Sequence, residues 1–227
     1  MNLHSNVTGS NTWLSWSSGK DALYQLLRNK YYSISKLFTT VTKEFERVSL
    51  HSTRKQLLQV QANRLSLPIE LVEIPKDCSN VCYQEIMLKT IVKAESENVR
   101  YMAFGDLFLD SVKKYREKQL ELTKINPVFP LWLKNTNELP RDFIEKGFKA
   151  IIVSIDTTKM PKNLIGHEYN MDFLKKLPTV VDPCGENGEF HTFVYDVPIF
   201  SRPINYVLGN IVEKDDMLYS DVLLNEN

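Results

Sequence analysis

Segments typical of β-strands and of α-helices alternate along the first half of the chain, and this order constrains the fold more than any other feature. Strands are expected at residues 12–16, 34–41, 69–74 and 99–104, and helices at residues 21–28, 53–65 and 81–94. Apolar residues recur at helical spacing in each expected helix. Strands separated by helices pair in parallel, with helices on both faces of the sheet. The sequence therefore predicts an α/β fold.

The order changes after Gly105 and Asp106, which end the fourth expected strand. A charged helix is expected over residues 111–122, a stretch bracketed by prolines over 127–130, another helix over 137–146 and a strand over 149–155. We therefore expect a first domain over residues 11–110 and a smaller α+β C-terminal lobe over residues 111–227. No glycine- or serine-rich linker marks the boundary between them.

Positive and negative side chains balance in this chain. Lys+Arg and Asp+Glu are both 28, so no global field attracts nucleic acid or anionic lipid. No apolar run approaches the length of a membrane span, and residues 1–11 lack the pattern of a secretion signal. Cys78, Cys82 and Cys184 cannot form a closed set of disulfides, which fits a reducing compartment. We expect a cytoplasmic protein with neither a nucleic-acid nor a membrane partner.

A short polar loop lies between the first strand and the first helix, and we call it the phosphate loop. It consists of Ser17, Ser18, Gly19, Lys20 and Asp21. The start of a helix offers backbone N–H groups and the positive end of the helix dipole to an anion. Gly19 allows a phosphate to approach the backbone, the serine hydroxyls add donors, and Lys20 adds a charge. The spacing of a Walker loop is absent, and plain helix capping by a serine explains the loop equally well.

Ser17 and Asp106 are expected at the same edge of the sheet. In open α/β sheets, ligands bind beyond the carboxyl ends of the strands, and each of these residues follows a strand. The sequence leaves open whether Asp106 binds a metal ion or a ribose.

A second polar cluster, Asp-Pro-Cys-Gly-Glu-Asn-Gly-Glu-Phe-His-Thr-Phe-Val, occupies residues 182–194. We call residues 182–189 the acidic turn. From Gly188 onward a strand is expected, with Glu189 and His191 on one face and Phe190 and Thr192 on the other. A carboxylate and an imidazole on one face can orient or deprotonate an amine and hold Mg²⁺. The alternative is a polar turn that enters a strand, with His191 hydrogen-bonded or exposed.

These motifs resemble those of a known family. Residues 16–22, Trp-Ser-Ser-Gly-Lys-Asp-Ala, are similar to the SGGKDS motif of the PP-loop ATP pyrophosphatases, with Ser18 and Ala22 as departures. The later motifs resemble, in order, the diphthine–ammonia ligase (diphthamide synthase) family of these proteins: Gly105-Asp106, Tyr115-Arg116-Glu117, Phe129-Pro-Leu-Trp132, Gly147-Phe-Lys-Ala150 and residues 182–194. The resemblance covers roughly residues 12–205. Glu-Asn-Gly-Glu-Phe-His at residues 186–191 looks like the branch found widely in bacteria, because members that make diphthamide carry Glu-Gly-Gly-Glu-Tyr-Glu.

The resemblance implies a HUP-type parallel sheet, and ATP and Mg²⁺ as cofactors. The implied reaction activates a carboxylate with ATP, releases pyrophosphate, and lets ammonia displace AMP to give an amide. The implied partners are ammonia and a carboxylate-bearing substrate, either a small molecule or a modified protein side chain, and a homodimer is left open. The implied residues are Ser17, Ser18, Gly19, Lys20, Asp21, Gly105 and Asp106 for the nucleotide, Asp21 and Asp106 for the metal, Glu186, Glu189 and His191 for catalysis, and His51, Asn187 and Gly188 for the substrate.

Two other functions compete with an AMP-forming amide ligase. A nucleotide-binding module that senses ATP or AMP is favoured by Ser18 and Ala22, whereas the acidic turn favours the enzyme. A PP-loop enzyme that modifies tRNA is disfavoured, because the chain has no CxxC pair. Its basic run is confined to residues 113–118, and a solvated helix face is the simpler interpretation of that run. Cys184 has no CxxC partner and is interpreted as a thiol that lines the turn.

Overall fold

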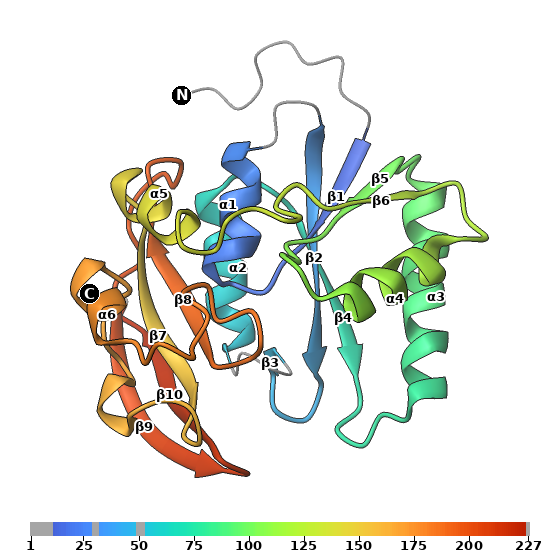
Figure 1. Cartoon of the computed structure of the whole chain (residues 1–227). Helices are drawn as coiled ribbons and strands as arrows, with labels where there is room; N and C mark the ends of the chain where they lie inside the picture. The colour runs from blue at the N-terminus through green and yellow to red at the C-terminus, as the bar shows by residue number, and fades with distance from the viewer. Residues whose placement is uncertain (1–10, 29–31, 49–52, 226–227) are drawn as a thin grey trace.

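The computed structural model describes residues 11–28, 32–48 and 53–225. In chain order its elements are β1 (Asn11–Ser15), α1 (Lys20–Arg28), β2 (Ser33–Thr42), β3 (Arg47–Val48), α2 (Lys55–Arg64), β4 (Ile69–Ile74), α3 (Asn80–Ser96), β5 (Tyr101–Ala103), α4 (Asp110–Leu120), β6 (Asn126–Val128), α5 (Leu139–Glu145), β7 (Lys149–Asp156), the 3-10 helix η1 (Lys162–Leu164), α6 (Met171–Lys176), β8 (Phe190–Asp196), β9 (Tyr206–Lys214) and β10 (Met217–Leu224). Two sheets result, with helices between and beside them (Figure 1).

The first sheet is parallel except for one short strand. Its order is β4-β2-β1-β5-β6, and β3 pairs antiparallel with the end of β2. Helices α1 and α2 cover one face, and α3 and α4 cover the other (Figure 1). The predicted α/β architecture, a parallel sheet with helices on both faces, is confirmed. Strands β2 and β4, which follow β1 in the chain, lie on one side of it, and β5 and β6 lie on the other side. The order of the strands therefore reverses between β1 and β5.

The second sheet is antiparallel, in the order β8-β7-β10-β9. It packs on the far side of α1 and α2, where β8 contacts α1 and β10 contacts α2. Strand β7 is buried at every position from Ala150 to Ile155, because α1 and α2 lie on one side of it and η1 and α6 on the other. A continuously apolar strand is what a sheet covered on both faces requires.

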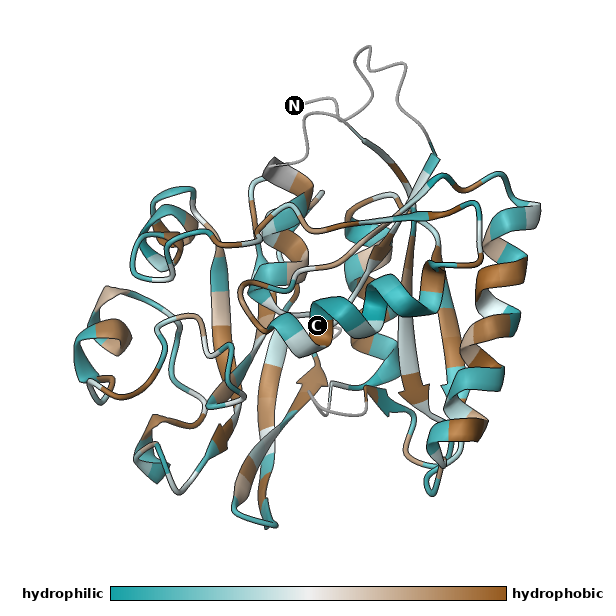
Figure 2. Cartoon of the chain, turned by 45° about the vertical axis from the view of Figure 1, so that its right-hand side comes forward, coloured by the Kyte–Doolittle hydropathy of each residue, from teal (hydrophilic) through white to brown (hydrophobic). Residues whose placement is uncertain are grey.

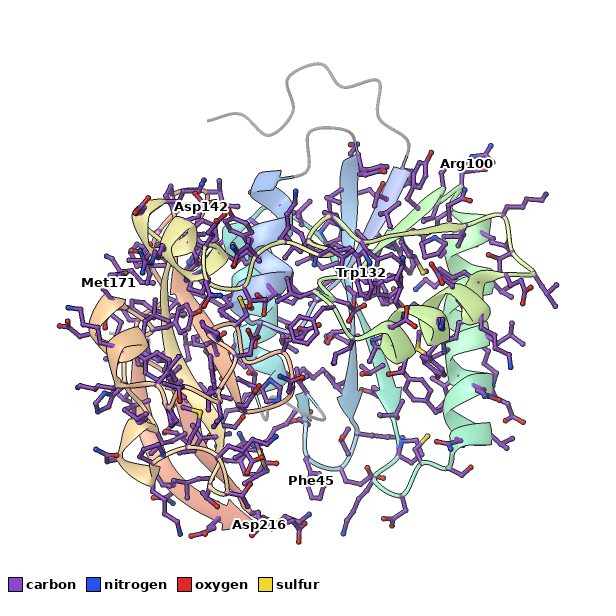
Figure 3. All side chains as sticks on the ribbon, viewed as in Figure 1. Phe45, Arg100, Trp132, Asp142, Met171 and Asp216 are labelled. Atoms are coloured by element: carbon purple, nitrogen blue, oxygen red, sulfur yellow. The ribbon has the colours of Figure 1, made fainter. Side chains whose placement is uncertain are left out.

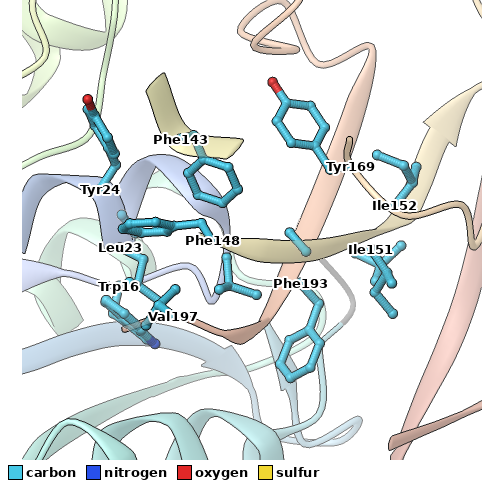
Figure 4. Close-up of a cluster of buried hydrophobic side chains, with 14 of the residues drawn as sticks. Trp16, Leu23, Tyr24, Phe143, Phe148, Ile151, Ile152, Tyr169, Phe193 and Val197 are labelled. Carbon is cyan, nitrogen blue, oxygen red and sulfur yellow. The ribbon is translucent and has the colours of Figure 1, made fainter. Parts of the chain in front are cut away.

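Two hydrophobic clusters hold these layers together. The larger one fills the space between the two sheets, and there Phe143 lies 4.5 Å from Phe148 and 5.7 Å from Tyr169 between ring centroids (Figure 4). The smaller one lies between the first sheet and α3, around Trp13 and Phe38. Hydropathy follows the same layers, with apolar residues on the strands and a largely hydrophilic α4 (Figure 2). The larger cluster makes the two sheets one folding unit rather than two loosely joined domains.

The first sheet extends beyond residue 110, where we expected the first domain to end. Strand β6 pairs in parallel with β5, and the N–H of Phe104 donates to the carbonyl of Val128. The residues between the two prolines therefore lie along the edge of the first sheet, and α4 is the crossover that leads to it. The first sheet therefore includes residues up to 128. The sequence could not show this, because local helix periodicity carries no information about which sheet a strand joins.

An ion-pair cluster joins the two sheets at the end where Phe45 and Asp216 mark the tips of two turns (Figure 3). Asp221 on β10 accepts from Arg47 at 2.8 Å and from Arg54 at 2.6 and 3.0 Å. Burial alone would raise the pKa of Asp221, but the bonds and charges of Arg54 and Arg47 outweigh it and lower the pKa to about 2. The carboxylate therefore stabilises the packing of β10 against α2.

We predict that Asp221→Asn lowers the free energy of unfolding by about 1–3 kcal/mol at neutral pH, because charge-assisted hydrogen bonds are lost. Since the pKa of Asp221 is lower in the folded state than its ordinary 3.8, its contribution is present above pH 3.8 and is lost as the pH falls toward 2. Urea unfolding at several pH values measures both effects. Asp215→Asn, in the exposed turn before β10, is the matched control; an equal loss in the two variants would contradict the prediction.

Candidate active site

The point where the strand order reverses carries a pocket of about 740 Å³. The phosphate loop follows β1, Gly105 and Asp106 follow β5, and the carboxyl ends of these neighbouring strands open into the same crevice, as in other open α/β sheets. The second sheet closes the crevice from the other side with the acidic turn and the start of β8. The structure thus brings together two segments that we expected at one edge and a third from the C-terminal lobe.

Gly105 allows the end of β5 to lie against α1. A Cβ atom at this position would lie 2.7 Å from the amide group of Gln25 and 3.4 Å from the backbone of Asp21. The buried Gln25 amide donates to the carbonyl of Phe104 at 3.0 Å and accepts from the N–H of Gly105 at 2.8 Å. A larger residue would displace this amide from its two backbone bonds. This contact places Asp106 next to the first turn of α1.

Ser18 has a structural role in the phosphate loop. Its φ is 71°, a left-handed conformation that favours glycine. Its hydroxyl is 2.8 Å from the hydroxyl of Thr53, and its carbonyl accepts from Gln61 Nε2 at 3.0 Å and from the N–H of Val194 at 3.1 Å. The side chain is buried and does not line the pocket, although Ser17 and Gly19 do. Our expectation that both serine hydroxyls face a phosphate is therefore wrong for Ser18.

Lys20 connects the phosphate loop to the acidic turn. Its ammonium is 2.8 Å from Asp21 Oδ2, donates to the carbonyl of Cys184, and lies 5.4 Å from the ring of Phe190. Burial alone would lower the pKa of Lys20, but the charge of Asp21 and the other acidic groups around it raise the pKa instead. A charged lysine therefore sits inside the pocket with one of its three donors still available.

Glu189 holds the acidic turn in shape. Strand β8 begins at Phe190, later than expected, so Glu189 belongs to the turn and not to a strand face shared with His191. Its Oε1 accepts from the N–H of Asp182 at 3.2 Å and from Asn187 Nδ2 at 3.0 Å, while the side chain is 2% exposed. Glu189 does not line the pocket, whereas Asn187 and Gly188 do.

Glu186 is the carboxylate of the acidic turn that reaches the pocket. Its Oε1 accepts from the N–H of Leu107 at 2.7 Å and of Phe108 at 3.4 Å, directly after Asp106. Burial raises the pKa of Glu186 to about 7, and the nearby charges of Asp21 and Asp106 add to the shift, although the two backbone bonds oppose it. A carboxylate with this pKa can exchange a proton near neutral pH.

His191 and Cys184 differ from Glu186 in their protonation. Burial and the charge of Lys20 lower the pKa of His191 to about 4, so its imidazole is neutral at pH 7. Burial raises the pKa of the Cys184 thiol far above neutrality, and its sulfur lies 3.6 Å from the carbonyl of Thr136. Cys184 is therefore a buried thiol that lines the turn, as we expected, and not an activated nucleophile.

Asp21 and Asp106 both line the pocket, and their oxygens suit Mg²⁺. Oδ2 of Asp106 is buried and has no hydrogen-bond partner among the residues that the structure describes, and burial raises the pKa of this carboxyl. Within the described ranges, no group of three or more acidic, histidine or cysteine side chains could hold a metal ion alone. Mg²⁺ is commonly held by one or two carboxylates together with substrate phosphates and water. The two carboxylates fit that kind of site.

Our sequence-based site omitted Arg116 and two residues of β10. Leu109, Val112 and Arg116, spaced three and four residues apart on one face of α4, line the pocket, and Met217 and Tyr219 line its far end. Lys114 and Lys118 are exposed, so the solvated-face interpretation fits much of this helix but not Arg116. The spacing of Leu109, Val112 and Arg116 could have revealed the arginine; no sequence signal pointed to β10.

His51, the remaining candidate, lies outside the described residues.

None of the helices within the described part of the chain has the length and apolar composition to cross a membrane.

We predict that Ser18→Gly is more stable than Ser18→Ala by roughly 1 kcal/mol, the cost of a left-handed backbone at a residue with a Cβ. Both variants lose the same hydrogen bond to Thr53, so each serves as the control for the other. Ser18→Ala should itself lose about 1–3 kcal/mol, because it leaves a buried hydroxyl unpartnered. Chemical unfolding gives the order, and equal stability of the two variants would show that the loop stores no strain.

Comparisons with known proteins relate part of this chain to one family. Residues 135–219 match the family model described as "Diphthamide synthase C-terminal domain". The chain is 31% identical over 117 residues to the diphthine–ammonia ligase of Mus musculus, an alignment that covers 48% of this chain and 43% of that protein. The Homo sapiens protein of the same name is 27% identical, again over 48% of this chain and 43% of that protein. The one from Schizosaccharomyces pombe is 30% identical over 37% of this chain and 14% of its own length.

The matched region thus corresponds to less than half of the length of these curated relatives. The family model begins in the segment before α5 and ends within β10, so it includes the acidic turn and the start of β8 that close the pocket. Residues 135–219 therefore match a diphthamide synthase C-terminal domain, and over about half of its length the chain is similar to diphthine–ammonia ligases.

Proposed function

We propose that this chain is an ATP-dependent amide ligase that adenylates a carboxylic acid and then transfers the acyl group to ammonia. One observation carries the proposal: Lys20 of the phosphate loop bonds to the carbonyl of Cys184 in the acidic turn. The residues suited to phosphate and the family-specific motif therefore meet in one pocket. The relatives named diphthine–ammonia ligase support ligase chemistry, and the acid that this chain activates is either a small molecule or a modified protein side chain.

The phosphate loop binds the triphosphate of ATP in this proposal. Phosphates are favoured at the N-terminus of α1, Gly19 lines the pocket without a side chain, and Lys20 offers its remaining donor to a phosphate oxygen. Asp21 and Asp106 would hold Mg²⁺, which supplies charge neutralisation for the departing pyrophosphate. Ser18 keeps the loop in shape from behind, through Thr53 and Gln61.

The acid and the amine react on the side of the pocket closed by the acidic turn. A carboxylate oxygen of the acid bonds to the α-phosphorus as the bond to pyrophosphate breaks. The nitrogen of ammonia then bonds to the acyl carbon, AMP leaves, and Glu186 accepts the proton that the nitrogen releases. The neutral His191 can accept or donate a hydrogen bond to the amine or acid, and Glu189 keeps Asn187 at the rim of the pocket.

The amide-forming step should follow the titration of Glu186. We predict that kcat/KM, compared at a constant concentration of free NH₃, rises about tenfold per pH unit below pH 7 and levels off above it, because the base must be deprotonated and the pKa of Glu186 is raised to about 7. Glu186→Gln should remove this inflection. An inflection that persists in that variant, or one near pH 4 where His191 titrates, would assign the base to another group.

The reaction itself is tested with purified protein, ATP, Mg²⁺, ammonium and a pool of carboxylic acids that includes cell extract. We predict equal amounts of AMP and pyrophosphate, formed only when the acid is present, and loss of both in Lys20→Ala. Lys118→Ala, an exposed position on α4, should retain the activity of the unmodified chain. ADP as the product would contradict the proposal. Tight ATP binding without AMP would instead favour a nucleotide sensor, which the internal bonds of Lys20 also suit.

A further inference from the structure

Arg116 is a half-buried cation that the phosphate loop and the acidic turn leave unexplained. It lines the same pocket, and its guanidinium carbon lies 5.0 Å from the ring of Phe104. Helix α4, which carries it, lies on the side of the molecule away from the second sheet (Figure 1). Its Nε is buried and has no hydrogen-bond partner within the described part of the chain. A buried guanidinium nitrogen without an acceptor is costly, so a ligand that brings an acceptor is favoured there.

The charges of the pocket indicate which ligand would suit this arginine. Among the described residues that line the pocket are three carboxylates, those of Asp21, Asp106 and Glu186, and two cations, Lys20 and Arg116. Lys20 already bonds to Asp21 and to the carbonyl of Cys184. A triphosphate adds several negative charges, and the fork of a guanidinium matches two phosphate oxygens better than an ammonium does.

We propose that Arg116 binds the β- and γ-phosphates of ATP and the pyrophosphate formed from them, from the α4 side of the pocket. The proposal rests on the nucleotide site of the proposed function, but not on the identity of the acid or the amine. The carboxyl of Asp106 interacts electrostatically with both Arg116 and Asp21, so the arginine and the phosphate loop act on the same part of the pocket. Arg116 therefore complements Lys20, and both cations act on the leaving group rather than on the adenosine.

Calorimetric binding of ATP, AMP and inorganic pyrophosphate, each with Mg²⁺, tests this assignment without requiring turnover. Arg116→Ala should weaken ATP and pyrophosphate on the order of 10- to 100-fold, the range of a charge-assisted hydrogen bond, and change AMP affinity by less than about twofold. Arg116→Lys, which keeps the charge and loses the fork, should fall in between. Lys118→Ala on the same helix is the matched control and should bind all three ligands like the unmodified chain.

Three outcomes would overturn the assignment: equal loss of AMP and ATP affinity, unchanged pyrophosphate affinity in Arg116→Ala, or no binding of ATP and pyrophosphate by the unmodified chain. If Arg116→Ala does not fold, as judged by circular dichroism, the comparison of Arg116→Lys with the control decides. A chain that shows the predicted selective loss but forms no AMP with any acid would refute the ligase and leave the role of Arg116 standing.

Discussion

The buried ammonium of Lys20 is the contact on which the arrangement of the pocket depends. It comes from the loop after β1 of the parallel sheet and bonds to a carbonyl in the turn before β8 of the antiparallel sheet. Asp21 and the surrounding acidic groups keep it charged in spite of burial. A charge in such a place is tolerated only when it is paired, so the acidic turn has to lie over the phosphate loop. This contact joins the two sheets at the pocket. At the other end, the ion pairs of Asp221 with Arg47 and Arg54 join them.

The same burial separates the protonation of the groups around the pocket. It raises the pKa of Glu186 to about 7 and, with the charge of Lys20, lowers that of His191 to about 4. Glu186 is therefore able to exchange a proton near neutral pH, and His191 stays neutral as a hydrogen-bonding group. Environments that separate the pKa values of groups in one pocket in this way are typical of sites of acid–base chemistry. The proposed division of roles between Glu186 and His191 follows from their surroundings, since residue type alone would favour the histidine.

Sequence patterns were most informative where they are local. The strand–helix order of the first half predicted the parallel sheet, and residues 69–74 form a strand with the bounds we expected. Local patterns were insufficient wherever a long-range contact decides. Residues 126–128 join the first sheet because β5 has a free edge, Ser18 faces Thr53 because the loop is anchored on α2, and Glu189 turns to Asp182 before β8 begins. Arg116 looked like one charge in a solvated run, although the turn of α4 directs it into the pocket.

The sequence by itself determined the α/β class, the positions of the phosphate loop and of Asp106 at the ends of strands, and the similarity to the diphthine–ammonia ligases. These depend on periodicity and on short motifs, which residues close in the chain encode. Only the tertiary structure decided which side chains of the motifs reach the pocket and with what protonation: Glu186 and not Glu189, a neutral His191, a tethered Lys20, and Arg116 beside Asp106. Side-chain direction and desolvation arise when the two sheets pack on α1 and α2, and no local pattern records them.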